Sequence, residues 1–308
     1  MLILVSAFFL VSISCATENY HLSYQVTIPK PLETFKSMKV WLPLPKNTHE
    51  QTFEIDQIVT PVSYTLNQDK KYNNQMLYFD LSKIEKFPVT IDVKTFVDRK
   101  IAKFSRLKNA VPIQEWSVNK FLSSNVMIPN DNVLFDLAND ASRGSITRFS
   151  TIKALYLKVV DKMKYSKHGQ GWGKGDALWA CNSEYGNCTD FHSVLIGMAR
   201  SIQIPARFEI GLPIPKSKTG TIGGYHCWAR LYDSNRGWIP VDASESYKTG
   251  VPLRFFGKLP ADRIHFSTGR DIILSPAQES APLNYFIYPY IEIDGVQSNT
   301  YTKSFTLN

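Results

Sequence analysis

Residues 20–100 alternate short apolar runs with polar clusters, and this pattern constrains the fold of that part of the chain most strongly. Residues 89–94 read VTIDVK, in which apolar and polar side chains alternate as in a strand with one buried face. Other runs rich in β-branched and aromatic residues precede it, namely YHLSYQVTI, KVWLPLP, FEIDQIV and MLYFDL. Residues 18–105 are therefore predicted to form an antiparallel β-sandwich.

Near residue 110 the alternation gives way to helical spacing. Segments 114–123 and 133–141 are predicted to be helical, and Ser150 is expected to cap a longer helix. A Gly- and Trp-rich stretch follows, and then a helix is predicted to begin at Cys188. Its apolar residues recur three and four positions apart, and it is expected to end before Pro205.

Strands return in the last third of the chain, in RFEIGLPIP, GYHCWARLYD and GWIPVDAS. The region 110–250 is thus predicted to pack a helix on an antiparallel sheet, which makes the whole chain α+β. A length of 308 residues suits two domains with an appendage. The appendage, residues 251–308, is predicted to be β-rich, with a hairpin around Asp294 and Gly295.

The charge of the chain argues against one class of partner. There are 35 Lys and Arg against 27 Asp and Glu, a formal net charge of +8 at pH 7. The basic residues are scattered, whereas a nucleic-acid surface needs them clustered. We therefore expect a solvated basic surface and no nucleic-acid partner. The surplus would still attract the anionic polymers of a cell envelope.

The N-terminal residues MLILVSAFFLVSISCA carry no charged side chain. Their apolar run, residues 2–13, is too short to span a bilayer as a helix and is typical of an export signal. Residues 1–16 are predicted to be a signal peptide, so the mature chain is expected in the periplasm or outside the cell. Cys15 offers lipidation as an alternative, which the three residues before it fit poorly. No later segment is apolar enough to cross a membrane.

Cys188 is the first candidate for chemistry, because it lies between a Gly/Asn loop and a predicted helix. A helix N-terminus carries unpaired N–H groups and a partial positive charge, which favour the thiolate over the thiol. The same N–H groups can hold the oxyanion of a tetrahedral intermediate. A single cysteine is more often a small buried apolar residue, so this interpretation needs support from other residues.

His226 and Asp242 supply that support. They lie on two predicted strands joined by the turn-like stretch 233–237. With Ser234 at the centre of the turn, His226 lies directly opposite Asp242, and the two side chains share a face. A carboxylate beside a histidine fixes its tautomer and stabilises its charged form, as in a catalytic triad. A bulge in either strand would change this register.

Three stretches together resemble the transglutaminase-like superfamily: GNCTDFHSVLIGMARSIQIPARFEIG, GGYHCWARLYD and GWIPVDAS. They keep the order Cys, His, Asp that this family shows, and the resemblance is specific over about residues 171–246. It implies a papain-like core in which the catalytic helix packs on an antiparallel sheet. Carried onto this chain, it makes Cys188 the nucleophile, His226 the general base and acid, and Asp242 the residue that orients the imidazole.

Other residues near these motifs have simpler explanations. His192, four residues after Cys188 and on the same helical face, is expected to pack behind or support the thiol. Among the nearby tryptophans, only Trp172, in the Gly-rich loop, is expected to line a cleft. Asp190 and Arg200 are expected to serve the helix start and the surface.

A zinc site built from Cys181, Cys188, His226 and Cys227 is disfavoured, because the spacing lacks any C-x-x-C. No Walker, dinucleotide-binding or EF-hand motif occurs, so neither a cofactor nor a metal is expected. If Cys15 leaves with the signal, three cysteines remain, and an odd number indicates a free thiol. Cys181 and Cys227 could form a disulfide, since Cys227 is predicted to point away from the triad; two free thiols are the alternative.

The predicted chemistry is acyl transfer through a thioester, on a peptide or carboxamide bond of a protein or peptide substrate. Hydrolysis is expected, because the segment after residue 250 is too short for two further domains. The Gly-rich loop 169–175 is also expected to be mobile, which leaves the site open to water. The alternatives are a true protein-glutamine transglutaminase, or a non-enzymatic cell-envelope binding module that retains the fold.

Overall fold

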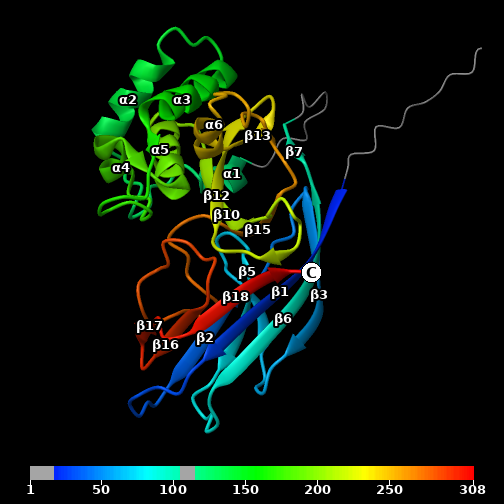
Figure 1. Ribbon diagram of the computed structural model, residues 1–308. Helices are drawn as coiled ribbons and strands as arrows, with labels where there is room; N and C mark the ends of the chain where they lie inside the picture. The colour runs from blue at the N-terminus through cyan, green and yellow to red at the C-terminus, as the bar shows by residue number, and fades with distance from the viewer. Residues whose placement is uncertain (1–16, 105–114) are drawn as a thin grey trace, which may run out of the picture.

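The computed structural model describes residues 17–104 and 115–308, and the predicted signal peptide 1–16 lies outside the described residues. The described chain has a β-sandwich at one end and a helix-covered sheet at the other (Figure 1). This arrangement confirms the α+β class and the order of its two parts.

The sandwich consists of two five-stranded sheets. The first has the order β11, β18, β1, β6, β3, with bounds in that order of Gly220–Thr221, Thr302–Leu307, Thr17–Ile28, Val89–Lys100 and Gln51–Val59. The second has the order β17, β16, β2, β5, β4, with bounds of Val296–Ser298, Tyr290–Ile293, Met38–Pro43, Gln75–Asp80 and Thr65–Gln68.

The alternating residues 89–94 form the predicted strand with one buried face, at the start of β6. In β6 the side chains of Val89, Ile91 and Val93 are buried, while the polar side chains between them stay at least partly exposed. The strand pairs with β1 along the full length of both strands. Apolar side chains from both sheets, such as Leu22 and Phe79, belong to one buried cluster, so the core lies between the sheets.

The last third of the chain completes both sheets of the sandwich. Asp294 and Gly295 have φ angles of +48° and +77° and join β16 to β17, which confirms the predicted turn, but the second strand of the hairpin is Val296–Ser298 and not the later run YTKSFTL. The strand after it, β18, crosses to the other sheet and pairs with β1. The limits 18–105, 110–250 and 251–308 stay a prediction, because the last segment supplies strands to both other parts.

The second part of the molecule is an antiparallel sheet in the order β13, β12, β10, β15. The bounds of its strands, in that order, are Gly237–Val241, His226–Asp233, Ala206–Pro213 and Arg263–Thr268. Helix α5 packs on β12 and β10. The other face of this sheet is turned toward the sandwich (Figure 1).

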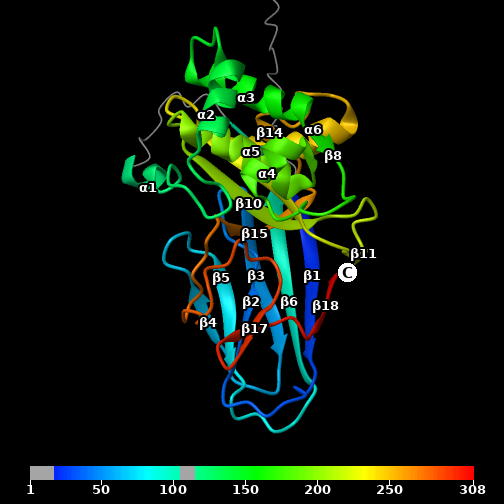
Figure 2. The same ribbon diagram turned by 90° about the vertical axis from the view of Figure 1, so that its left-hand side faces the viewer.

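Further helices surround α5 at this end of the molecule (Figure 2). The helix bounds, from α1 to α6, are Glu115–Asn119, Asn132–Ser142, Arg148–Lys162, Ala177–Ser183, Cys188–Ser201 and Ala243–Thr249. Short pairs join β14 (Lys258–Leu259) to β7 (Ala102–Lys103) and β8 (Lys164–Tyr165) to β9 (Tyr185–Gly186). Over residues 17–104 and 115–308, none of the helices combines the length and apolar character needed to cross a bilayer.

The start of α3 corrects one detail. The cap is Thr147, and Ser150 is the third helical residue. The Thr147 hydroxyl accepts from the Ser150 amide at 3.1 Å, and the Ser150 hydroxyl accepts from the Thr147 amide at 3.0 Å. The two residues form a reciprocal capping box. The prediction therefore identified the correct helix and its first turn, but named the third helical residue in place of the cap.

Candidate active site

Cys188 is the first residue of α5, as predicted, and its side chain is buried. Asn187 caps the helix by accepting from the Thr189 amide at 2.8 Å. Asp190 completes the capping box by accepting from the Asn187 amide at 2.8 Å. The thiol therefore lies at a well-formed helix N-terminus, where partial positive charge stabilises a thiolate.

Asp190 also anchors the Gly-rich loop to this helix. Its carboxylate accepts from the amides of Gly173 at 2.7 Å and Gly175 at 2.9 Å. Gly175 has a φ of +65°, and a Cβ there would lie 2.6 Å from Thr189, so both backbone and packing require glycine. The expectation of a mobile loop is wrong for this half of it, because backbone donors are bound to a buried carboxylate.

Arg270 holds the same loop from the other side. Its buried guanidinium donates to the carbonyl oxygens of Lys174 and Gly175, each at 3.2 Å, and to the Ser193 hydroxyl at 3.0 Å. The Arg270 Nε donates to Asn284 Oδ1 at 2.7 Å. Arg270 thus joins the loop, α5 and the C-terminal segment, a role that no local sequence pattern indicated.

His226 and Asp242 meet as predicted, but through a different register. The His226 Nε2 and an Asp242 carboxylate oxygen are 2.6 Å apart. The centre of the hairpin is Asn235 and not Ser234, because Asp233 pairs with Gly237 and Ala229 with Val241. The register error is two residues, and side chains in a strand alternate with period two, so the predicted face was still right.

Asp242 is a fully buried carboxylate with a complete set of donors. One oxygen accepts from His226 and from Arg263 Nη1 at 2.9 Å. The other accepts from the Ser244 hydroxyl and the Glu245 amide, both at 3.0 Å, and so caps α6. Burial raises the pKa of Asp242, but the charges of His226 and Arg263 outweigh burial and hold that pKa well below its usual value. Asp242 is therefore ionised at neutral pH.

The side chains of Cys227 and His226 both interact with the Cys188 thiol. The interactions with Cys227 and then with His226 outweigh burial and hold the pKa of Cys188 well below its ordinary value. Burial lowers the pKa of His226, but Asp242 and Cys188 together raise it to about 9. The site therefore favours a thiolate and imidazolium pair at neutral pH.

Cys227 corrects a prediction about orientation. Its side chain does not point away from the site, because its Sγ lies 3.6 Å from the Thr189 hydroxyl and interacts with Cys188. Cys227 lies on β12, which α5 contacts. The face of the sheet that α5 covers is therefore also the face next to the Cys188 thiol. Cys181, Cys188 and Cys227 are all free and buried, which does not support the proposed Cys181 to Cys227 disulfide.

His192 connects the two ends of the site. Its Nδ1 lies 2.7 Å from the Cys188 carbonyl oxygen, and its Nε2 accepts from the Ala243 amide at 3.1 Å. A carbonyl oxygen can only accept, so Nδ1 carries the proton and the ring is neutral. Burial lowers the pKa of His192, which agrees with a neutral ring. This is the supporting position expected for it.

Arg200 is not a surface residue, contrary to expectation. Only 6% of it is exposed, and its guanidinium donates to the carbonyl oxygens of Ala206 and Ser123 and to Asn125 Oδ1. These acceptors follow no sequence pattern around Arg200, so the prediction rested on its charge alone, which indicated a solvent-exposed position.

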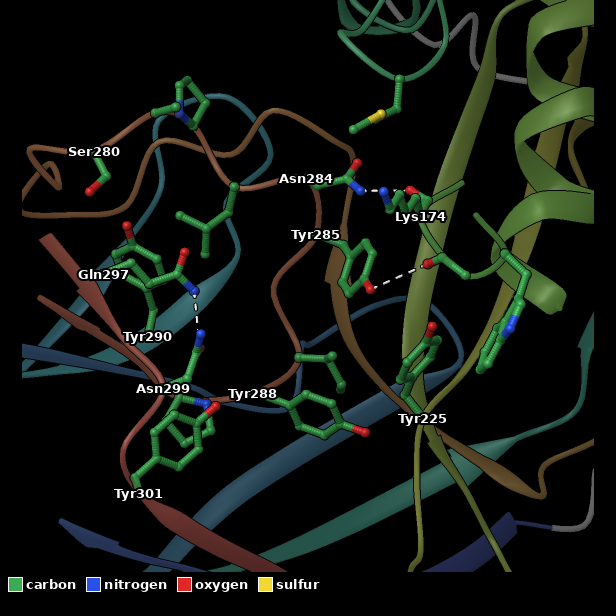
Figure 3. Close-up of a pocket in the computed structure, with 18 residues that line it drawn as sticks. Lys174, Tyr225, Ser280, Asn284, Tyr285, Tyr288, Tyr290, Gln297, Asn299 and Tyr301 are labelled. Carbon is green, nitrogen blue, oxygen red and sulfur yellow. Dashed lines mark hydrogen bonds between the residues drawn. The ribbon is translucent and has the colours of Figure 1, made fainter. Parts of the chain in front are cut away.

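A cavity of about 710 Å³ lies between Tyr225, the Gly-rich loop at Trp172 to Lys174, and the C-terminal segment, and Cys188 itself does not line it. Figure 3 shows tyrosine, asparagine and glutamine side chains arranged around it, most of them from the C-terminal segment. The lining residues are Met127, Trp172, Gly173, Lys174, Tyr225, Ser280, Ala281, Pro282, Leu283, Asn284, Tyr285, Ile287, Tyr288, Pro289, Tyr290, Gln297, Asn299 and Tyr301. Trp172 lines the cavity, as expected of it.

Tyr225 links this cavity to the thiol. It precedes His226, and its hydroxyl lies 3.2 Å from both Asn187 Nδ2 and the Thr189 hydroxyl, on the two residues that flank Cys188. The sequence reasoning did not identify Tyr225 or the C-terminal wall. The one available signal was the run NYFIYPY at 284–290, which is unusually aromatic for a solvent-exposed extension.

Comparisons with known proteins agree with this architecture. A protein of Haemophilus influenzae described as uncharacterised is 24% identical over 91% of this chain and 86% of its own length. The fold is similar to that of a Cytophaga hutchinsonii protein provisionally assigned to the cysteine proteases, with a TM-score of 0.57, 14% identity, and 95% of this chain and 98% of that chain covered. The periplasmic domain of TgpA from Pseudomonas aeruginosa has a TM-score of 0.40 at 14% identity, with 75% of this chain and 91% of that chain covered.

A family model matches the part of the chain that carries the site. The match covers residues 136–243 and the model describes the transglutaminase-like superfamily, which confirms the resemblance inferred from the motifs. The matched segment contains α5 and the strands that carry His226 and lead to Asp242. Over residues 136–243 the chain therefore matches the transglutaminase-like superfamily.

Proposed function

We propose that the protein is an exported thiol enzyme that hydrolyses a peptide or carboxamide bond through a thioester. The observation that carries this proposal is the buried pair of His226 and Asp242, 2.6 Å apart, with the Cys188 thiol at a helix N-terminus interacting with His226. A nucleophile, a base within reach of it and a group that orients the base are the parts that covalent acyl transfer needs. Export is supported by the apolar run at residues 2–13.

The reaction begins with the Cys188 thiolate, which attacks the substrate carbonyl carbon and forms a C–S bond. The C–N bond then breaks, and His226 gives its proton to the leaving amine. The neutral His226 next takes a proton from water, whose oxygen attacks the thioester carbon. The acid product leaves, and the thiolate and imidazolium pair is restored.

The Cys188 backbone N–H is the proposed first donor to the oxyanion. It belongs to the first turn of α5, where an amide has no carbonyl four residues earlier in the helix to bond. An amide in this position also carries part of the positive end of the helix dipole. Donors already in place when charge develops on the carbonyl oxygen supply much of the rate enhancement in acyl transfer.

The cavity in Figure 3 is the proposed approach to the thiol. It adjoins Asn187 and Thr189 through Tyr225 and has aromatic walls with several amide groups. Tyrosine and asparagine side chains offer apolar contact and adaptable hydrogen bonds, which suit a polypeptide.

The choice of water as acceptor rests on the organisation of the C-terminal segment. Residues 290–307 complete the two sandwich sheets and do not form additional domains over the site. The anchored Gly-rich loop and the buried Cys188 thiol favour transfer to an amine instead, since both restrict the access of water to the thioester. A true transglutaminase is therefore the second candidate.

We expect acid release to exceed amine incorporation when the mature chain is given a glutamine-donor peptide and a millimolar primary amine. Water is present at high concentration, and the C-terminal strands of the described chain join the sandwich sheets, where they do not position an amine at the thiol. Both products can be followed by mass spectrometry in one reaction. Predominant incorporation of the amine would establish transfer and refute hydrolysis, and neither product from a broad peptide library would count against the enzyme proposal.

Iodoacetamide at pH 6 is expected to alkylate Cys188 at least about tenfold faster than either other cysteine. The Cys188 pKa is held low, while burial raises the pKa of Cys181 and the pKa of Cys227 lies well above its ordinary value. Above about pH 9, where His226 loses its proton, turnover is expected to fall while labelling persists, since only turnover needs the acid. Peptide mapping of the labelled chain gives the site, and faster labelling of Cys227 would contradict the assignment.

A further inference from the structure

A second cavity, of about 590 Å³, lies between the sandwich and the sheet of the second part. Its wall takes residues from the connection after β2, from the end of α1, and from β10, β12, β13 and β15. Among the described residues it shares none with the cavity lined by Tyr225. The proposed acyl-transfer chemistry gives this cavity no role.

The wall of this cavity is strongly basic. Its charged lining residues of the Lys and Arg type are Lys46, Lys103, Lys120, Arg207, Arg230 and Arg236. The one carboxylate among the described lining residues is Glu50, and Arg230 engages it with two bonds of 2.9 and 3.1 Å. A bidentate pair of this kind leaves Glu50 little capacity for the other cations.

Other carboxylates behind the wall balance only part of the charge. Glu209 pairs with Arg230 at 3.0 Å and with Arg207 at 2.8 Å, and Asp233 lies 3.6 Å from Arg236. Each arginine on the wall therefore has a carboxylate partner. Among the described residues neither carboxylate forms an ion pair with Lys46 or Lys120, although the charge of Glu209 partly offsets the lowering of the Lys46 pKa by burial.

Lys46 and Lys120 have only neutral hydrogen-bond partners in the described part of the chain. The Lys46 Nζ donates to the Tyr72 carbonyl oxygen and, at 3.1 Å, to Asn74 Oδ1, and the Lys120 Nζ donates to the Lys71 carbonyl oxygen at 2.8 Å. Burial lowers the pKa of Lys46 to about 8, and repulsion from Arg207 and Lys120 contributes, although the charge of Asp69 opposes it. The two lysines are thus like charges held together without a full counter-charge.

Arg207 adds a guanidinium that is already held in place. It lies 4.5 Å from the centre of the Trp238 ring and 6.0 Å from that of Phe121. Its Nε is buried and has no hydrogen-bond partner among the described residues. A stacked guanidinium with a free donor is preorganised to bind an oxyanion.

We propose that this cavity binds a phosphate group. Two lysine point charges and one arginine donor suit a ligand with several acceptor oxygens and more than one negative charge, which a single carboxylate does not supply. Thr48, Ser117 and Thr268 also line the cavity. A free phosphate, a polymeric phosphate and a lipid headgroup share this chemistry, and the arms of the experiment separate these sources.

The test measures pyrophosphate binding to the mature chain by isothermal titration calorimetry at constant ionic strength. One site per chain is expected, and K46Q/K120Q is expected to weaken binding by at least about tenfold. K83Q/K94Q removes the same charge from exposed lysines outside the cavity and is expected to change affinity by less than about twofold. If the first double variant fails to fold by circular dichroism, K120Q alone is measured and is expected to weaken binding by at least about threefold.

Flotation with vesicles of phosphatidylglycerol, and of phosphatidylcholine as a neutral control, identifies the source of the phosphate. Binding to phosphatidylglycerol that K46Q/K120Q abolishes assigns the site to a lipid headgroup. Binding of pyrophosphate without vesicle binding assigns it to a soluble or polymeric phosphate. Absence of saturable pyrophosphate binding, or equal affinity in the two double variants, would overturn the proposal and leave the proposed thiol chemistry untouched.

Discussion

Replacing Cys188 with alanine is expected to lower turnover by about 10⁶-fold, because the other thiol in the site, Cys227, has a pKa well above its ordinary value and stays protonated at neutral pH. The fold should survive, since alanine is well tolerated in the first turn of a helix and the Asn187 and Asp190 cap does not involve the Cys188 side chain. A loss of about 1 kcal/mol in unfolding free energy is expected from the missing sulfur. H226A should cost almost as much turnover, because members of such a unit fail together.

Cys181→Ala is the matched control for the nucleophile. It removes another buried thiol from the same region, on α4, and is expected to keep turnover within about twofold. Initial rates and urea unfolding curves for both variants separate chemistry from stability. Substantial turnover by C188A, or loss of turnover by C181A in a folded chain, would show that the nucleophile lies elsewhere.

Replacing Asp242 with asparagine is expected to lower turnover by about 10⁴-fold and to destabilise the fold by about 3–5 kcal/mol at neutral pH. The carboxylate accepts from four donors, two of them on His226 and Arg263. An amide offers one oxygen only, so His226 loses its orienting acceptor and the buried Arg263 loses its counter-charge. Turnover should fall less than in C188A, because the thiolate remains.

The pH dependence of this destabilisation follows from two pKa shifts. The Asp242 pKa is held below its ordinary 3.8, so its contribution to stability is present above pH 3.8 and is lost as pH falls. The His226 pKa is raised from 6.5 to about 9, so its contribution is complete below pH 6.5 and is lost as pH rises through 9. The stability difference between D242N and the wild type should therefore be largest between about pH 4 and pH 6.5.

Asp262→Asn provides the isosteric control. Asp262 also pairs with Arg263, at 3.3 Å, but its side chain is 57% exposed, so its loss should cost no more than about 1 kcal/mol. Urea denaturation of D242N and D262N at several pH values between 4 and 9 measures both contributions. Equal destabilisation by the two substitutions, or a difference independent of pH, would show that the ion pairs at Asp242 do not stabilise the site.

Much of this architecture could be inferred from local sequence patterns. Alternation at residues 89–94 located a strand of the sandwich, and helical spacing after residue 187 located α5 with Cys188 at its start. The order of Cys188, His226 and Asp242 pointed to one family, which the match over residues 136–243 confirmed. These features are determined locally because side-chain periodicity and helix caps depend on residues only a few positions apart.

Tertiary structure decided the features that depend on partners far along the chain. It separated the last two strands into different sheets, and it brought Arg263 to Asp242 and Arg270 to the Gly-rich loop. It also turned Cys227 toward Cys188 and built a cavity wall from the C-terminal segment. The physical reason is that buried charges and carbonyl oxygens bond whichever donors packing brings near, and these donors need no regular spacing in sequence.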